Sequence, residues 1–259
     1  MSVFFETLFQ RCAATLESLS WQHVKLKSKS RISLSPHFRS FPLLRYMRLS
    51  FISLSPATFS SLLLSPLKHL ELPIYLENLI ESLVTCEPLR DLQSLIISTL
   101  PSQSQQSKHV AEFIRRHKHV HKLIVHERNS TNMDRFIIPI LAERGFNNLC
   151  CLSLGWSAES VGPLTGPREF HIPETALMAL GTIASLEKLS LRAGNNFGWR
   201  NQWLIDHGKL HQYLGTLHRL KMLALARDTY PIPSPSHTDA ECYHLVRWVG
   251  DGERADAED

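Results

Sequence analysis

The chain has 259 residues, of which 43% are hydrophobic and 20% are charged, and its formal net charge is +4 at pH 7. This balance excludes a long disordered or collagen-like chain and requires a buried core. The five cysteines include no C-x-x-C pair, so neither a disulfide framework nor a zinc site is indicated. Because no apolar run approaches the roughly 18 residues of a membrane span, we expect a cytoplasmic or nuclear protein without a membrane partner.

Leucine accounts for 41 residues, and much of it falls in a repeated pattern. The pattern L-x-x-L-x-L, with conservative replacements, starts at Leu16, Leu44, Leu67, Leu92, Val120, Leu149, Leu186 and Leu220. The fourth and sixth residues of each copy are two apart, which is typical of a strand with one buried face, whereas the segments between copies have helical spacing. We therefore predict stacked strand–helix units that share one core, since a single unit is too small to bury its own apolar face.

Two of the connecting segments show the helical spacing clearly. The segment 76–86 predicts an amphipathic helix, and its apolar residues at intervals of three and four include Leu79, Ile80, Leu83 and Val84. The segment 133–144 predicts a second such helix. Pro139 lies inside it, so a kink or a 3₁₀ stretch is expected there, and Gly145 is placed to end the helix as a left-handed cap.

The two ends of the repeated region have their own patterns. Phe5, Leu8, Phe9 and Cys12 form one helical stripe before the first strand. Residues 1–230 are predicted to form the solenoid. After it, the capping-box spacing at 238–241 predicts a C-terminal capping helix within 231–250, and residues 251–259 are expected to be a disordered acidic tail.

The eight copies resemble those of an irregular leucine-rich repeat protein over about residues 10–230. This resemblance implies an α/β arc or horseshoe of about eight repeats, with parallel strands on the concave face and helices on the convex face. No copy carries the Asn or Cys that the family commonly places eight residues after the repeat start, so an uneven arc is expected.

The long, variable repeats, together with the segment 197–230 and a closing helix, are similar to fungal leucine-rich-repeat proteins of the F-box-associated group. That similarity implies the target-binding region of an F-box-type ubiquitin-ligase substrate receptor. No F-box is visible before Leu16, so a Skp-type adaptor is expected as a partner only if an F-box lies upstream.

A protein partner is expected on the concave face. Strand alternation places the third, fifth and seventh residues of each copy on that face. The candidate contact residues there are Tyr46, Arg48, His69, Glu71, Lys122, His126, Lys188 and Arg192.

A second candidate surface comes from the two longest intervals between copies, in which extra residues follow the sixth and seventh strands. Insertions in repeat proteins gather on one face, so these segments are expected to be neighbours in space. They contain residue types that dominate interface hot spots: Trp156, Phe170, Phe197, Trp199, Arg200 and Trp203. The alternative is that Trp199 and Trp203 only fasten a long loop to the core.

Other chemistries are not favoured by the residues. His117, His119 and His121 are spaced two apart, but they fall at a predicted helix C-terminus and lack adjacent Cys, Asp or Glu ligands. No P-loop, G-x-S-x-G or H-E-x-x-H motif occurs, and the basic residues are not concentrated on one face as nucleic-acid binding requires. We therefore expect a non-enzymatic interaction protein with no cofactor and no metal, or alternatively a free-standing scaffold or inhibitor unconnected with ubiquitin.

Overall fold

The computed structural model describes residues 7, 11–21, 41–49, 54–72, 79–127, 132–156, 168–170, 172–192, 201–204, 206–226 and 228–229. Apart from Cys12, the predicted N-terminal stripe lies outside these residues, as do the predicted capping helix and the acidic segment. Within the described part of the chain, no helix is long and apolar enough to cross a membrane.

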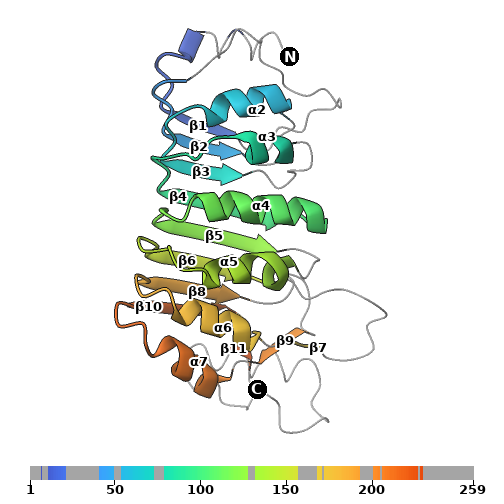
Figure 1. Ribbon diagram of the computed structural model, residues 1–259, viewed down its shortest axis with the longest axis vertical. Helices are drawn as coiled ribbons and strands as arrows, with labels where there is room; N and C mark the ends of the chain where they lie inside the picture. The colour runs from blue at the N-terminus through green and yellow to red at the C-terminus, as the bar shows by residue number, and fades with distance from the viewer. Residues whose placement is uncertain are drawn as a thin grey trace, which may run out of the picture.

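Eight parallel strands form one open sheet, and their order in the sheet is their order along the chain. The strands are β1 (Ser18–Trp21), β2 (Tyr46–Leu49), β3 (His69–Leu72), β4 (Ser94–Leu100), β5 (Lys122–Glu127), β6 (Cys151–Gly155), β8 (Lys188–Arg192) and β10 (Met222–Ala226). Figure 1 shows them stacked along the long axis of the molecule. Every strand begins at the third residue of its L-x-x-L-x-L copy, so the eight predicted strands are confirmed.

The copies are structurally equivalent at each junction. The third residue of one copy pairs with the third residue of the next throughout the sheet, as Tyr46 does with His69. A second feature shared by all junctions is a pair of backbone hydrogen bonds. The carbonyl of the second residue of one copy accepts the N–H groups of the second and third residues of the following copy. At the first junction Arg45 and Tyr46 donate to the Glu17 carbonyl at 2.8 and 3.2 Å, and equivalent bonds occur at all seven junctions.

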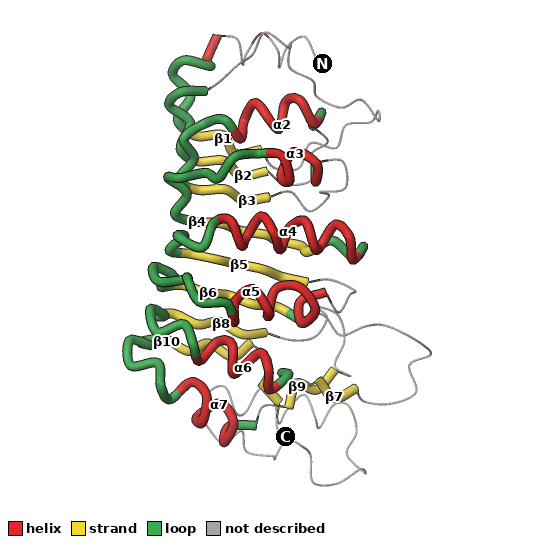
Figure 2. The backbone as a smooth tube through the Cα atoms, viewed as in Figure 1, coloured by secondary structure: helices red, strands yellow, loops and turns green. Residues whose placement is uncertain are grey.

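From β2 onwards, helices connect successive strands of the main sheet and lie on one side of it (Figure 1; Figure 2). They are α2 (Pro56–Leu63), α3 (Ile80–Thr85), α4 (Ser104–Arg116), the π-helix η1 (Met133–Ile137), α5 (Ile138–Ala142), α6 (Glu174–Gly181) and α7 (His207–Leu214). Neighbouring helices pack against one another, for example α3 against α4 and α6 against α7. This arrangement confirms an α/β stack of strand–helix units around an open parallel sheet.

Local sequence explains where two of these helices begin. Ser55 precedes α2, and its hydroxyl accepts the backbone N–H of Thr58 at 3.2 Å, while Pro56 occupies the first turn, where its missing N–H costs nothing. Asp206 caps α7 in the same way, since Oδ1 accepts the N–H of Lys209 at 3.0 Å. These side chains satisfy backbone donors that a helix leaves unpaired at its N-terminus.

Three details of the predicted helices differ from the structure. Val84 was expected on the apolar face of its helix but is 43% exposed, whereas Ile80 and Leu83 are buried. The stretch around Pro139 contains a π-turn rather than a 3₁₀ stretch. Pro139 has no N–H to bond one turn back, and Ile138 instead donates to the Met133 carbonyl five residues earlier. Gly145 has a φ of +130°, but it lies beyond an extended cap residue, Glu143, so it shapes the loop after the helix rather than capping it.

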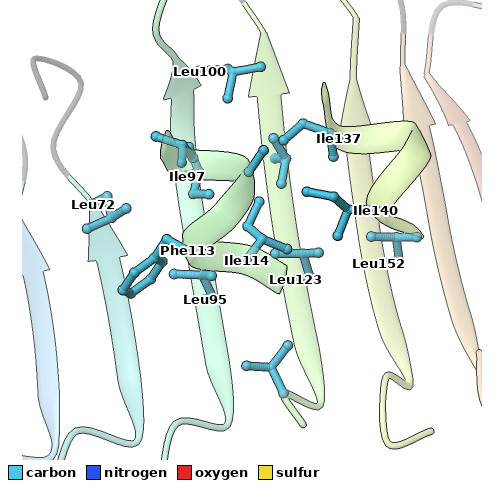
Figure 3. Packing of buried hydrophobic residues seen from close by; sticks show 14 of the residues in the cluster. Leu72, Leu95, Ile97, Leu100, Phe113, Ile114, Leu123, Ile137, Ile140 and Leu152 are labelled. Atoms are coloured by element: carbon cyan, nitrogen blue, oxygen red, sulfur yellow. The ribbon is translucent and has the colours of Figure 1, made fainter. Parts of the chain in front are cut away.

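The core lies between the sheet and the helices. It is formed by the fourth and sixth residues of the copies, such as Leu95 and Leu123, together with the inward faces of the helices. Figure 3 shows Phe113 and Ile114 of α4 over the strands, and both are fully buried. Burying a side chain of this kind contributes about 2 kcal/mol. The leucine excess thus forms one continuous core along the stack.

A second, smaller sheet joins one strand from each insertion to a short strand that follows β10. It contains β7 (Arg168–Phe170), β9 (Asn201–Leu204) and β11 (Asp228–Thr229), all parallel, in the order β11-β9-β7. β7 belongs to the insertion after β6, and β9 belongs to the insertion after β8. Their pairing confirms that the two insertions are neighbours in space.

Candidate functional site

The face of the main sheet opposite the helices, here called the open face, carries the third, fifth and seventh residues of the copies. Along β4 and β5 the open-face side chains are half-buried, whereas the alternate ones are buried in the core. All eight predicted concave-face residues lie on this face, because strand register places them there. Whether they bind a partner remains a prediction.

On β2 and β3 the open-face side chains interact with one another. The rings of Tyr46 and His69 stack with their centroids 4.3 Å apart and their planes within 3°. Arg48 forms an ion pair with Glu71, with 3.0 Å between Nε and Oε2, and the Ser98 hydroxyl donates to Oε1 of Glu71 at 3.4 Å. The charges of this half of the open face are therefore paired internally.

The ionisation of His69 reflects the same surroundings. Burial lowers the pKa of His69 below its ordinary value, and the positive charges of Lys122 and Arg48 lower it further. A neutral imidazole is thereby favoured between Tyr46 and Ser94, with which His69 is paired in register. The His69 ring therefore adds no positive charge to the open face at neutral pH.

The other half of the open face, on β5, β6 and β8, carries positive charge around short side chains. Lys122 and Lys188 lie on either side of Cys151, and His126 and Arg192 lie on either side of Gly155. Between these two rows lies Ser153, whose hydroxyl is 3.5 Å from Nε2 of His126. The centre strand thus offers only small side chains, and larger ones flank it at both ends, at Lys122 and Lys188 and at His126 and Arg192.

His126 and Arg192 approach each other across Gly155. A Cβ atom on Gly155 would lie 2.8 Å from Nε of Arg192 and 2.9 Å from Cδ2 of His126, so both side chains extend over this glycine. Burial, and secondarily the charge of Arg192, lowers the pKa of His126 to about 4. His126 is therefore neutral at physiological pH, and the positive charge at this end belongs to Arg192.

The structure describes three of the six predicted insertion residues, Trp156, Phe170 and Trp203. Phe170 and Trp203 are register partners in β7 and β9, so the backbone brings these two predicted residues together. Phe197, Trp199 and Arg200 lie outside the described residues. The partner-binding prediction for Trp156 is wrong: its side chain is 3% exposed, and Nε1 donates to Oδ1 of Asp134 at 2.8 Å. Trp156 follows β6 directly and packs into the core.

The histidines of the segment 117–121 fasten neighbouring units together. His117 is fully buried; its Nδ1 donates to the Phe113 carbonyl at 2.6 Å and its Nε2 accepts the N–H of Leu89 at 2.9 Å. His119 reaches the same residue, because its Nε2 lies 3.0 Å from the Leu89 carbonyl. Burial lowers the pKa of His117 to about 4, so the imidazole is neutral in the folded chain.

A periodic core position was missed in the sequence. It lies three residues before the motif start and is occupied by Phe41, Leu89, His117, Phe146, Ile183 and Leu217, all of which are buried. His117 therefore replaces an apolar residue. The copy that starts at Leu67 departs from this, since Leu64 is exposed. Aligning the copies further upstream would have revealed the position.

Asn132 is a second residue that was missed. Its side-chain amide is buried and donates to the carbonyls of Pro101 and Ser102 at 3.1 and 2.9 Å, and to the Ser107 hydroxyl at 3.1 Å. It lies 12 residues after the motif start at Val120, beyond the position, eight residues after the start, where leucine-rich repeats commonly carry Asn. This side chain satisfies backbone carbonyls of the preceding unit, as a regular asparagine ladder would.

The comparisons with known proteins give no relative to set beside this geometry. No protein-family model matches the chain, and no curated protein matches it.

Proposed function

We propose that the chain is a non-enzymatic protein-recognition module of the leucine-rich-repeat type, which binds its target on the open face. The observation that supports this most is the continuous eight-stranded sheet whose described helices all lie on the other side. The proposal is also supported by the L-x-x-L-x-L copy that leads into every strand and by the matched register between copies. A stack of such units presents an extended surface of side chains at regular spacing, which suits a protein partner.

We further propose that this module selects the target of an F-box-type ubiquitin-ligase receptor. The support is the similarity of the long, variable repeats to those of the fungal F-box-associated group. The alternative is a free-standing scaffold or inhibitor that uses the same surface. A pull-down with a Skp-type adaptor, made with any upstream coding sequence restored, separates the two: stable capture supports the receptor, and no capture supports the free-standing protein.

The binding surface itself is tested by blocking it with one bulky side chain. Ser153 lies on the open face between β5 and β8. Ser153→Trp should therefore abolish capture of a partner that the wild-type protein retains from a native cell extract. Ala57→Trp, at an exposed position on α2, adds the same side chain on the helix side and should leave capture unchanged. Equal capture by wild type and Ser153→Trp would exclude this part of the open face as the recognition surface.

A further inference from the structure

The two middle strands of the open face carry a pair of aliphatic side chains, Ile96 on β4 and Ile124 on β5. The two residues are partners in register, so their Cα atoms are about 4.8 Å apart and their side chains lie next to each other. Both are half-buried, whereas Leu95 and Leu123 beside them face the helices and are fully buried. Ile96 and Ile124, here called the Ile pair, therefore expose part of their apolar surface at the middle of the eight-stranded sheet.

Strand formation does not require isoleucine at these two positions. Ile96 and Ile124 are the fifth residues of their copies, and the other six copies form equivalent strands with Ser, Arg, Glu or Ala there. Among the open-face positions that the structure describes, there is no further Ile, Val, Leu or Phe. The Ile pair is thus a local aliphatic surface for which the fold itself gives no reason.

Polar side chains surround the Ile pair. Ser94 and Ser98 flank it along β4, and Ser153 lies beside it on β6. Glu71 lies beside it on β3, and its carboxylate is already paired with Arg48, with 3.0 Å between Nε and Oε2. An apolar centre within a polar rim is the arrangement that energetic hot spots have at protein interfaces.

The positive charge next to the Ile pair comes from Lys122. This residue precedes Ile124 by two positions on β5 and lies on the same face, so the two Cα atoms are roughly 7 Å apart. In the described part of the chain, no carboxylate lies within ion-pair distance of Lys122. The neighbouring imidazoles of His69 and His126 add no charge at neutral pH, because burial lowers the pKa of both. Charge complementarity therefore favours an occupant with a negative group close to its apolar one.

We propose that the Ile pair is the anchor site for an extended segment of the partner protein, which carries an aliphatic side chain and a carboxylate two residues away. The aliphatic side chain packs on Ile96 and Ile124, and the carboxylate contacts the ammonium of Lys122. Same-side residues of an extended peptide are about 7 Å apart, which matches the spacing of Ile124 and Lys122 along β5. This inference rests on the proposed recognition function and names the chemistry of the segment that is recognised.

The test measures binding of a fluorescein-labelled ten-residue peptide to the full chain by fluorescence anisotropy. Serine occupies the odd positions of the peptide, and Leu and Glu alternate at the even positions, so each Leu is two residues from a Glu. A peptide with Ala in place of Leu should bind about tenfold more weakly, because it buries less apolar surface. A peptide with Gln in place of Glu should bind about threefold more weakly, and this smaller difference should vanish at high salt concentration.

Variants of the chain locate the site. Ile124→Thr keeps a β-branched residue in the strand but removes apolar surface, so it should weaken binding of the Leu–Glu peptide about tenfold. Val84→Thr makes a similar change at a position on α3 that is 43% exposed, and it should leave the affinity unchanged.

A second pair of variants tests the carboxylate contact. Lys122→Gln should weaken binding of the Leu–Glu peptide about threefold and should not change binding of the Leu–Gln peptide. Lys108→Gln, at an exposed position on α4, is the matched control and should change neither affinity.

Three results would overturn the inference. They are equal affinity for the Leu and Ala peptides, equal weakening by Ile124→Thr and Val84→Thr, and a wild-type dimer in sedimentation velocity that Ile124→Thr dissociates. The last result would assign the Ile pair to a second copy of the chain.

The proposed function fails separately from this inference. If Ser153→Trp abolishes capture of the partner while Ile96→Thr and Ile124→Thr leave it unchanged, the open face is the recognition surface and only the anchor site is wrong. If Ser153→Trp leaves capture unchanged, the proposed function is wrong at this part of the open face, whatever the peptides show.

Discussion

The replacement of His117 by leucine tests how the units are fastened together. His117 occupies a core position that is apolar in the equivalent units at Phe41, Phe146, Ile183 and Leu217. His117→Leu preserves the apolar packing, but it removes the acceptor of the Leu89 N–H and the donor to the Phe113 carbonyl. A buried backbone group left without a partner costs about 1 to 3 kcal/mol, so the variant should be less stable than wild type by about 2 kcal/mol at pH 7.5.

The same residue makes the difference depend on pH. The pKa of His117 is about 4 in the folded chain and 6.5 as its ordinary value. Between these pH values the unfolded chain binds more protons, so the stability from this group is present above pH 6.5 and is lost as the pH falls towards 4. At 1.36 kcal/mol per pKa unit, wild type loses about 2 kcal/mol from this group between pH 6.5 and pH 5, and about 3 kcal/mol by pH 4.

The two effects together predict that the stability deficit of His117→Leu disappears near pH 5. The assay is urea unfolding, followed by far-ultraviolet circular dichroism, of wild type and variant at pH 7.5 and 5.0. His211→Leu, at an exposed position on α7, controls for the general effect of replacing a histidine. A free-energy difference between wild type and His117→Leu that is the same at both pH values would refute the assignment of His117 as a neutral, buried hydrogen-bonding residue.

Three further substitutions test other parts of the fold by the same unfolding assay. Ile114→Ala should destabilise the chain by about 2 to 5 kcal/mol, because Ile114 is fully buried between α4 and the sheet; a loss below 1 kcal/mol would contradict that packing. Asn132→Ala should cost about 1 to 3 kcal/mol, since it leaves the Pro101 and Ser102 carbonyls without their donor; Asn132→Asp lacks the same donor and should not restore stability. Gly145→Ala should cost about 1 kcal/mol because of the φ of +130°; an unchanged midpoint would show that the loop relaxes without strain.

The strands could be predicted because the same L-x-x-L-x-L spacing occurs eight times, although the copies are unevenly spaced along the chain. Alternation fixes which residues face the core once a strand is placed, and the common motif start fixes the register between strands. The helices were harder to place, because they are short and their ends depend on single residues. Pro139 is an example: its missing N–H was recognised, but the resulting π-turn depends on how Ile138 reaches the Met133 carbonyl.

The candidate site could be predicted only as a set of positions. The eight open-face residues follow from alternation, but the contacts among them depend on side-chain conformations and on pairs across strands. Arg48 and Glu71, for example, are 23 residues apart in the chain and were not recognised as an ion pair. Trp156 was misassigned because the sequence does not show that its indole reaches back to Asp134 on the preceding helix. The closeness of the two insertions followed from their positions, but the small sheet, in which Phe170 pairs with Trp203, did not.

The most direct test of the account is hydroxyl-radical footprinting of the chain alone and in complex with a partner that it retains from a native extract. In the complex, oxidation of the open-face residues Tyr46, Cys151 and Met222 should decrease relative to the chain alone. Oxidation of Met178, which is 53% exposed on α6, should be unchanged. Protection of Met178 together with unchanged oxidation of the three open-face residues would contradict the account, because it would place the partner on the helices.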